Sequence, residues 1–457
     1  MKVLLTHGYF LEEDAKEQEI MRPYPPLGLL YISAYLEKNG FPCRVFDSTF
    51  ASFGRLKACL ENEQPDLIGI YVNLMTRLNV LRIMEFIRKH PRLKDKKVVL
   101  GGPEVRSHAR EFLSRGADIV VLGEGEETML ELLGHFSSAA PKPLSGIAGI
   151  SYRTPGGEWV TTAERALISA VSNLPLPDRE KIDLQRYFQA WKARHGYSSL
   201  SVSTMRGCPY TCKWCSRSVY GLSYRRREPA HVADELQKLV REYQPDMFWF
   251  VDDVFTISHK WLKDFARELS ARGLRIRYEC ITRADRMNAE VVRLLKESGC
   301  HRVWIGAESG SQKVLDAMDR RVKAGQVREM IALSKRHGIE SGTFIMLGYP
   351  GETQADIETT IAHLKLSRPD MYTITLAYPI KGTAFYQEVE DRFLDRLDWD
   401  KSTDRDIDFK RTYTRKYYDH AVRLVYNEVE FSRSGKLKHK LKALLSRGGM
   451  LLERMRA

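Results

Sequence analysis

The chain has 457 residues, of which 43% are hydrophobic and 29% charged, and a formal net charge of +13. This length allows two or three domains with their own cores, and the composition excludes an intrinsically disordered chain. A positive net charge is compatible with binding to nucleic acid, to an anionic membrane surface or to an acidic ligand, and the net charge alone does not distinguish these partners.

Residues 1–140 alternate apolar strands with helices. This alternation predicts an α/β fold with a doubly wound parallel sheet, similar to a Rossmann fold, whose ligands bind at the carboxyl ends of the strands. Glycine-rich loops follow the fourth and fifth strands, and neither a G-x-G-x-x-G fingerprint nor a P-loop is present. The strands are expected at Val3–Thr6, Cys43–Asp47, Leu67–Val72, Val98–Leu100 and Ile119–Leu122.

Residues 141–190 are predicted to be a linker that contains a β-hairpin. The hairpin strands are Ile150–Arg153 and Trp159–Thr161, joined through a Pro-Gly-Gly turn. Leu174–Asp178, with its two prolines, forms a second extended joint. Two domains hinged here could bring one onto the strand ends of the other.

Strand and helix patterns resume over residues 191–384. Six strands in this pattern predict a barrel-type sheet, in which active groups project from the carboxyl ends of the strands. The strands are expected at Leu200–Met205, Met247–Val251, Ile276–Ile281, Arg302–Gly306, Gly342–Leu347 and Tyr372–Ala377.

Three cysteines, Cys208, Cys212 and Cys215, follow the first of these six strands as C-x₃-C-x₂-C. Thiolates on one short loop suit zinc or an iron–sulfur centre. A structural zinc site needs four ligands, and no fourth cysteine or histidine lies nearby. Three thiolates therefore favour a [4Fe–4S] cluster with one iron open to another ligand. The other cysteines are scattered and are predicted to be core thiols: Cys43, Cys59, Cys280 and Cys300.

The cysteine spacing at the end of a barrel's first strand, with Trp214 before the third cysteine, resembles the radical S-adenosylmethionine (SAM) superfamily. The resemblance implies a (β/α)₆ partial TIM barrel. It also implies that the open iron chelates SAM and that the cluster cleaves SAM reductively to a 5′-deoxyadenosyl radical, with no side-chain general base. The expected SAM contacts lie on the cysteine loop and at strand ends: Trp214, Asp252, Asp253, Arg283, Glu308, Ser309, Gly310, Gly348, Tyr349 and Pro350.

The polar residues at these strand ends could each bind a different part of SAM. Glu308 can accept hydrogen bonds from the hydroxyls or ammonium of SAM, and Arg283 can pair with its carboxylate. The alternative is a set of structural ion pairs at the strand ends. That alternative is as strong as the functional one for Asp252 and Asp253.

Four blocks of the first domain resemble the cobalamin-binding domain found ahead of many radical SAM enzymes: Pro25–Tyr31, Pro65–Ile70, Leu100–Pro103 and Gly123–Glu126. The loop around His7 lacks the D-x-H-x-x-G motif, so the resemblance implies cobalamin without a histidine ligand to cobalt. His7 is expected to cap backbone groups instead. The alternative is a domain that has lost its cofactor and only docks substrate. The expected cobalamin contacts are Gly8, Tyr9, Asn73, Leu74, Met75, Thr76, Gly101, Gly102, Pro103, Gly123, Glu124, Gly125 and Glu126.

Residues 385–457 are predicted to be a helical extension that closes the open side of the half-barrel. From Arg433 onward, lysines and arginines alternate with leucines in a basic amphipathic pattern. This tail could lie on an anionic membrane, pack on the barrel or be disordered. Nucleic acid is disfavoured, because stacking aromatics do not accompany the charge. No apolar run approaches the roughly 18 residues of a membrane span, and the N-terminus lacks a secretory pattern, so a cytoplasmic protein is expected, with membrane association open.

The resemblance implies an enzyme, most commonly a methyltransferase that moves a methyl group from cobalamin to an unactivated carbon of a small molecule, lipid or tetrapyrrole. Its electron donor would be a flavodoxin or ferredoxin. Alternatives are an oxidative cyclase of the anaerobic magnesium-protoporphyrin ester type, a rearrangement enzyme, or a non-catalytic cobalamin- or cluster-binding sensor. A methylthiotransferase is disfavoured, because Cys43 and Cys59 are the only cysteines of the first domain.

Overall fold

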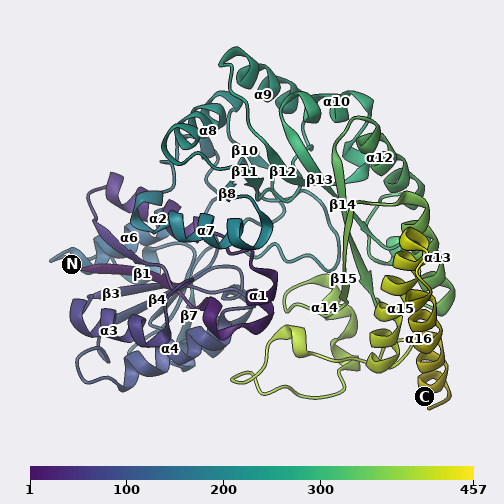
Figure 1. The fold of residues 1–457 in the computed structure, drawn as a ribbon. Helices are drawn as coiled ribbons and strands as arrows, with labels where there is room; N and C mark the ends of the chain where they lie inside the picture. Colours follow the sequence, from purple (N-terminus) through teal and green to yellow (C-terminus); the bar gives the residue numbers. More distant parts are fainter. Residues whose placement is uncertain (457) are drawn as a thin grey trace.

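A computed structural model describes residues 1–456, and Figure 1 shows two α/β units side by side with a helical layer at the outer rim of the second. The first sheet has the order β2-β1-β3-β4-β5-β6-β7, and its first five strands are parallel. The doubly wound prediction is therefore confirmed. The strands are β1 Val3–His7, β2 Cys43–Phe46, β3 Leu67–Tyr71, β4 Lys97–Gly101 and β5 Ile119–Val121. The helices are α1 Ala15–Ile20, α2 Leu27–Lys38, α3 Phe53–Glu63, α4 Arg77–Lys89, α5 Ala109–Ser114 and α6 Glu126–Ser137.

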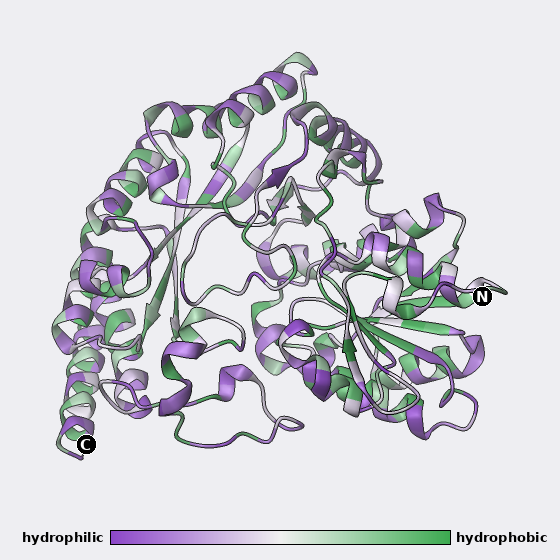
Figure 2. Ribbon diagram, turned by 180° about the vertical axis from the view of Figure 1, so that it is seen from behind, coloured by the Kyte–Doolittle hydropathy of each residue, from purple (hydrophilic) through white to green (hydrophobic). Residues whose placement is uncertain are grey.

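The predicted hairpin forms, but it belongs to the first sheet rather than to a free linker. Its strands β6 (Ile150–Arg153) and β7 (Trp159–Thr161) are antiparallel, and β6 pairs with β5. Ile150 is fully buried in the same apolar cluster as strand β5, which explains the docking. The hairpin also covers the edge that the short β5 would otherwise expose. Figure 2 shows the strands of this sheet largely in the green of hydrophobic residues, and the helices around them in alternating green and purple.

The second sheet has the order β15-β14-β13-β12-β11-β8, with all strands parallel. Strands β8 and β15 form its two edges, so the sheet is an open six-stranded half-barrel, as predicted. Its strands are β8 Ser199–Val202, β11 Met247–Phe250, β12 Tyr278–Thr282, β13 Cys300–Glu308, β14 Glu340–Leu347 and β15 Met371–Leu376. Its helices are α8 Pro229–Tyr243, α9 His259–Ala271, α10 Ala289–Glu297, α11 Gln312–Ala317, α12 Ala324–Arg336 and α13 Gln354–Ser367.

Helix α7 (Leu184–His195) leads into the half-barrel, and a small ribbon of β9 (Met205–Arg206) and β10 (Arg225–Arg226) flanks the cysteine loop. The C-terminal extension contains α14 (Ala384–Val389), α15 (Arg415–Ser434) and α16 (Leu437–Arg456).

Helix α15 packs on α13 and β14, and α16 packs on α15 (Figure 1). Tyr417, Tyr418 and Leu424 of α15 are buried in the barrel core. The tail is therefore a packed helix rather than a disordered segment. None of the helices in residues 1–456 has the length and apolar composition that crossing a membrane requires. The domain boundaries predicted from the sequence stay predictions.

Candidate active site

A cavity of about 390 Å³ lies between the two units, where the strand ends of the first sheet face the cysteine loop of the second. It brings together residues predicted for two different cofactors. The predicted site residues in its wall are Gly101, Gly102, Pro103, Gly123, Glu124, Gly125, Glu126, Cys208, Cys215, Asp252 and Asp253.

The inner end of the cavity is apolar and the rim on the first unit is glycine-rich. Leu5, Val99 and Met129 line the inner end, between the sheet and the helices α2 and α6. At the rim, Gly102 has a φ of 114°, and a Cβ there would collide with the carbonyl of Val72. Only glycine therefore allows this loop to pack against the residues at the end of β3. An apolar slot behind such a rim fits cobalamin, whose corrin ring is broad and whose nucleotide base is aromatic.

The cysteine loop is held in place by its backbone. Lys213 N donates to Met318 O at 3.1 Å, and Phe385 N donates to Lys213 O at 2.9 Å. These bonds attach the loop to the end of α11 and the start of α14. Cys212 is buried, and Cys208 and Cys215 line the cavity.

The surroundings of the three thiols suit an anionic iron–sulfur cluster. Burial raises the pKa of Cys208, and it raises the pKa of Cys215 to about 12. The free thiols of Cys208 and Cys215 are thus neutral at pH 7, and iron must displace their protons. Arg283 Nη1 and Arg320 Nη1 lie 3.5 and 3.7 Å from Cys212 Sγ and can balance the negative charge.

The two aspartates at the end of β11 differ in role. Asp252 is buried and accepts hydrogen bonds from Thr204 N at 2.7 Å and Met205 N at 3.1 Å. It therefore ties β11 to the strand that enters the cysteine loop. Asp253 lines the cavity, where burial by the walls and then the charge of Asp252 raise its pKa to about 6. Of the two, only Asp253 is placed to meet a ligand with its side chain.

The ends of β12 and β13 meet behind the cysteine loop. Arg283 is buried, pairs with Asp285 at 2.9 Å and lies 3.8 Å from the centre of the Tyr210 ring. Glu308 has a left-handed backbone with φ of 62°, and burial raises its pKa. Such backbone strain is concentrated at functional sites. Arg320 lies 3.9 Å from Glu308. It was not predicted from the sequence, because it follows helix α11 and not the end of a strand.

Ser309 and Gly310 face away from the cavity, toward α13. Ser309 Oγ lies 3.2 Å from Thr360 Oγ1, and Gly310 N donates to the same hydroxyl at 3.0 Å. A Cβ at Gly310 would lie 2.6 Å from the Thr360 Cα atom, so only glycine allows this packing. Their predicted role in SAM binding is thus limited to backbone groups or to the position of β13.

The loop that follows β14 is also folded inward. Tyr349 is fully buried and stacks on Phe385, with ring centres 4.8 Å apart. Its ring therefore belongs to the core under the C-terminal extension and is not free to stack on adenine. Gly348 N donates to the Glu352 carboxylate at 2.6 Å, and Pro350 is half-buried. Trp214 packs against the same apolar cluster as Tyr349.

Burial raises the pKa of Glu352 to about 8 from its usual 4.5. An acid with a raised folded-state pKa stabilises the fold fully below pH 4.5, and that stability falls as the pH rises toward 8, by about 5 kcal/mol at most. We expect Glu352→Gln to remove this loss. Thermal unfolding should show the variant more stable than the parent near pH 9 and nearly equal near pH 5.

The exposed Glu329→Gln on α12 is the matched control and should leave the pH profile of unfolding unchanged. Parallel profiles for the Glu352→Gln variant and the parent would show that Glu352 is ionised in the folded protein across this range.

The remaining predicted cobalamin contacts do not line this cavity. Gly8 packs against α4, where a Cβ would lie 3.0 Å from Thr76 O. Asn73 Oδ1 accepts from Met75 N and Thr76 N, both at 3.0 Å, and so closes the loop before α4. The predicted cobalamin contacts that are not among the lining residues of this cavity are Gly8, Tyr9, Asn73, Leu74, Met75 and Thr76.

His7 caps backbone groups, as expected. Its Nδ1 accepts from Tyr9 N at 3.2 Å, and its Nε2 lies 3.0 Å from Asp47 Oδ1. Both ring nitrogens are therefore engaged. No histidine is among the residues described as lining the cavity.

An ion-pair cluster, missed in the sequence, joins the two units at the cavity. Arg206, two residues before Cys208, donates to both Glu124 and Glu126. Arg225 donates to the other oxygen of Glu124 at 2.6 Å. Both glutamates and Arg206 are buried. We call these four residues the interdomain clamp. The glutamates predicted as cobalamin contacts thus hold the second unit against the first.

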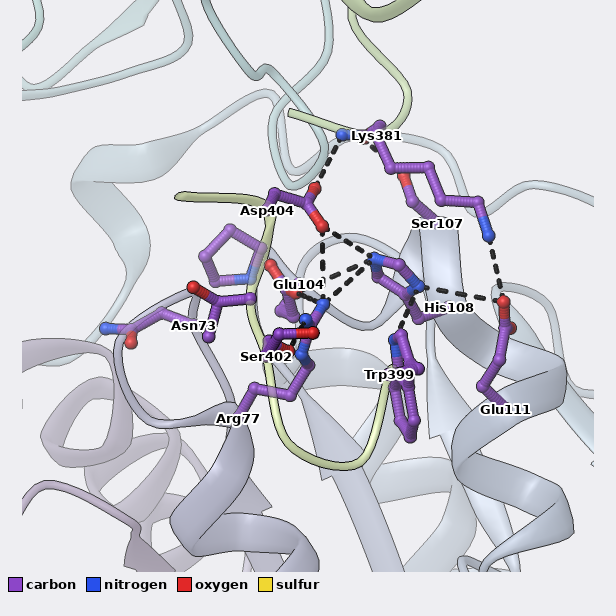
Figure 3. Close-up of polar contacts among 12 residues, drawn as sticks. Asn73, Arg77, Glu104, Ser107, His108, Glu111, Lys381, Trp399, Ser402 and Asp404 are labelled. Carbon is purple, nitrogen blue, oxygen red and sulfur yellow. Dashed lines mark hydrogen bonds and ion pairs between the residues drawn. The ribbon is translucent and has the colours of Figure 1, made fainter. Parts of the chain in front are cut away.

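A second interdomain contact joins the loop around Trp399 to the end of the first sheet (Figure 3). Glu104, His108 and Asp404 offer ligand atoms within 4.8 Å of one another, as a metal site would. However, Arg77 Nη1 lies 2.7 Å from Glu104 and 3.4 Å from Asp404, so its guanidinium already occupies the place of a cation. Trp399 Nε1 donates to His108 Nδ1 at 3.0 Å.

Comparison with known families agrees with both halves of this site. The profile of the radical SAM superfamily matches residues 202–364, and the profile of the B12 binding domain matches residues 19–133. An uncharacterized methyltransferase of Pyrococcus horikoshii is 29% identical over 435 residues, covering 93% of this chain and 92% of the relative. The anaerobic magnesium-protoporphyrin IX monomethyl ester cyclase of Cereibacter sphaeroides is 26% identical, covering 86% of this chain and 64% of the cyclase.

Solved structures show the same fold. The radical SAM methyltransferase TsrM of Kitasatospora setae, with cobalamin and a [4Fe–4S] cluster bound, superposes with a TM-score of 0.69 at 21% identity over 85% of this chain and 74% of TsrM. The cobalamin-dependent radical SAM enzyme OxsB, with aqua-cobalamin bound, superposes with a TM-score of 0.77 at 16% identity over 93% of this chain and 66% of OxsB.

The chain belongs to the cobalamin-binding branch of the radical SAM superfamily. It is a radical SAM enzyme, and its cofactors are a [4Fe–4S] cluster, SAM and cobalamin.

Proposed function

We propose that this enzyme methylates a carbon atom of an organic substrate bound between the cobalamin and the cluster. The observation that carries the proposal is the single cavity that glycine loops of the first unit and Cys208 and Cys215 of the second both line. When bound, the cluster with SAM supplies hydrogen-atom abstraction and cobalamin supplies the methyl group. A cavity shared by both cofactor sites holds a substrate carbon within reach of each.

The residues of this chain bind and orient the reactants. Cys208, Cys212 and Cys215 hold the cluster, and Arg283 and Arg320 balance its charge from behind Cys212. On the cavity side, Asp253 can accept hydrogen bonds from the ammonium or ribose hydroxyls of SAM. Glu308 adds a second carboxyl group beside the guanidinium of Arg320.

Cobalamin, when bound, would be held in the first unit by residues of the cavity wall. The residues that would contact it are the glycine loops Gly101–Pro103 and Gly123–Glu126 and the apolar side chains of Leu5 and Met129. His7 is engaged by Asp47 at 3.0 Å and is not among the residues that line the cavity.

The test is product analysis with SAM that carries a deuterated methyl group. Protein reconstituted anaerobically with iron, sulfide and cobalamin, and reduced by flavodoxin, is incubated with a hopanoid or a tetrapyrrole ester. We expect the label in the product, with 5′-deoxyadenosine and S-adenosylhomocysteine in equal amounts. Absence of 5′-deoxyadenosine under reducing conditions would instead support a cofactor-binding sensor.

Oxidative cyclisation is the second candidate, because three anaerobic cyclases match 82–86% of this chain at 25–26% identity. The same experiment separates the two reactions. A cyclase would form 5′-deoxyadenosine and consume the substrate without incorporating the label or forming S-adenosylhomocysteine.

A further inference from the structure

Helix α16 has two faces, and the inner face packs on α15. Ala443, Ser446 and Met450 are buried there. Gly449 makes the close approach to α15 possible, since a Cβ at that position would collide with the imidazole of His420. Arg447 also pairs with Glu428 of α15 at 3.1 Å. These contacts determine which side of α16 faces outward.

The outer face carries a row of apolar side chains, which we call the leucine stripe. At about 100° per residue, its members fall within an arc of about 120°, opposite the buried side chains. Each member is between 54% and 75% exposed. The members are Leu437, Leu441, Leu444, Leu445, Leu451, Leu452 and Met455. Their exposure is unusual for a monomeric protein, because large contiguous apolar patches usually mark an interaction surface.

Basic residues border the leucine stripe on both sides. On the same helical projection, one border has Lys438, Lys442 and Arg456, and the other has Lys440 and Arg454. The single acid of α16, Glu453, is only 11% exposed in its side chain and pairs with Arg456. The outer face of the helix is thus apolar along its centre and positive along both edges.

We propose that the leucine stripe docks this enzyme on an anionic lipid surface. An interfacial helix inserts its apolar face about 5–10 Å into the headgroup region, and flanking cations pair with anionic headgroups. A second copy of the chain fits less well, because pairing two such stripes would set basic borders against basic borders. Helix α16 forms the outer rim of the molecule, so the rest of the chain does not shield the stripe (Figure 1).

The proposal is tested by flotation of the full chain with vesicles of phosphatidylcholine that contain about one third phosphatidylglycerol. We expect binding at low salt that weakens at high salt, because the headgroup interaction is screened. The triple variant Leu441→Gln, Leu445→Gln, Leu452→Gln should reduce the bound fraction at least tenfold. All three positions are exposed, so iron content and melting temperature should match those of the parent.

A matched triple control replaces three exposed apolar residues elsewhere, Ile20, Leu176 and Leu394, by glutamine and should float like the parent. Three results would overturn the proposal: no flotation of the parent, equal flotation of the stripe variant, or equal binding to pure phosphatidylcholine. A parent dimer that the stripe variant converts to a monomer, seen by light scattering, would assign the stripe to a second copy instead. None of these readouts depends on methyl transfer.

Discussion

Replacing Cys212 by alanine is expected to reduce SAM cleavage to the background of the reductant. Cys212 is the buried cysteine of the three, and both Arg283 and Arg320 point at its sulfur. Without this thiolate, the cluster loses one of its three ligands, and the loop has no fourth cysteine to replace it. Enzymes typically accelerate reactions by at least about 10⁶-fold, so loss of the centre removes essentially all turnover.

The measurements are iron and sulfide content, about four of each per chain in the parent, and 5′-deoxyadenosine formed under reducing conditions. Cys59→Ala is the matched control, since Cys59 is a half-buried thiol outside the loop. It should keep both the cluster and the cleavage. A Cys212→Ala protein with a full complement of iron and normal cleavage would show that Cys212 is not a cluster ligand.

Replacing Arg206 by methionine is expected to loosen the two units from each other. The variant leaves Glu126 buried without its cation, whereas Glu124 keeps Arg225. Removing one partner of a buried ion pair typically costs about 3–5 kcal/mol. If cobalamin binds in the cavity that the clamp closes, as proposed, we also expect its affinity to fall by about 100-fold, which corresponds to about 2.7 kcal/mol.

Denaturant unfolding measures the first effect, and cobalamin titration followed by absorbance measures the second. Arg241→Met is the matched control, because Arg241 is 76% exposed and pairs only with its neighbour Glu242. The double variant with Glu126→Gln should recover part of the loss, since it removes the uncompensated charge. Unchanged stability and affinity in Arg206→Met would mean that the clamp does not hold the units together.

The sequence predicted those parts of the site that depend on short spacings. The cysteine loop follows from C-x₃-C-x₂-C, and the rim of the cavity follows from the glycines after β4 and β5. Both parallel sheets follow from the alternation of strands and helices. The strand order of the first sheet was not predicted, because β1 lies between β2 and β3, which are consecutive in the chain.

The parts that could not be predicted depend on which distant segment covers a strand end. Gly310 and Tyr349 follow their strands as expected, but α13 and α14 pack over them and turn them inward. Arg206 lies 82 residues from Glu124, so neither local pattern identifies the pair. The hairpin was predicted, but the sheet that it joins is known only from the pairing of β6 with β5 and the burial of Ile150 in the structure.

The contact between Arg77 and Asp404 has a consequence for synthesis on the ribosome. These residues are 327 positions apart, yet Arg77 is only 2% exposed in the finished protein. At roughly 5–20 residues per second, Asp404 follows Arg77 by on the order of half a minute. Throughout that interval the nascent first domain carries an exposed guanidinium and Glu104 at the edge that Trp399 later covers. Translation of the last quarter of the chain therefore completes the first domain.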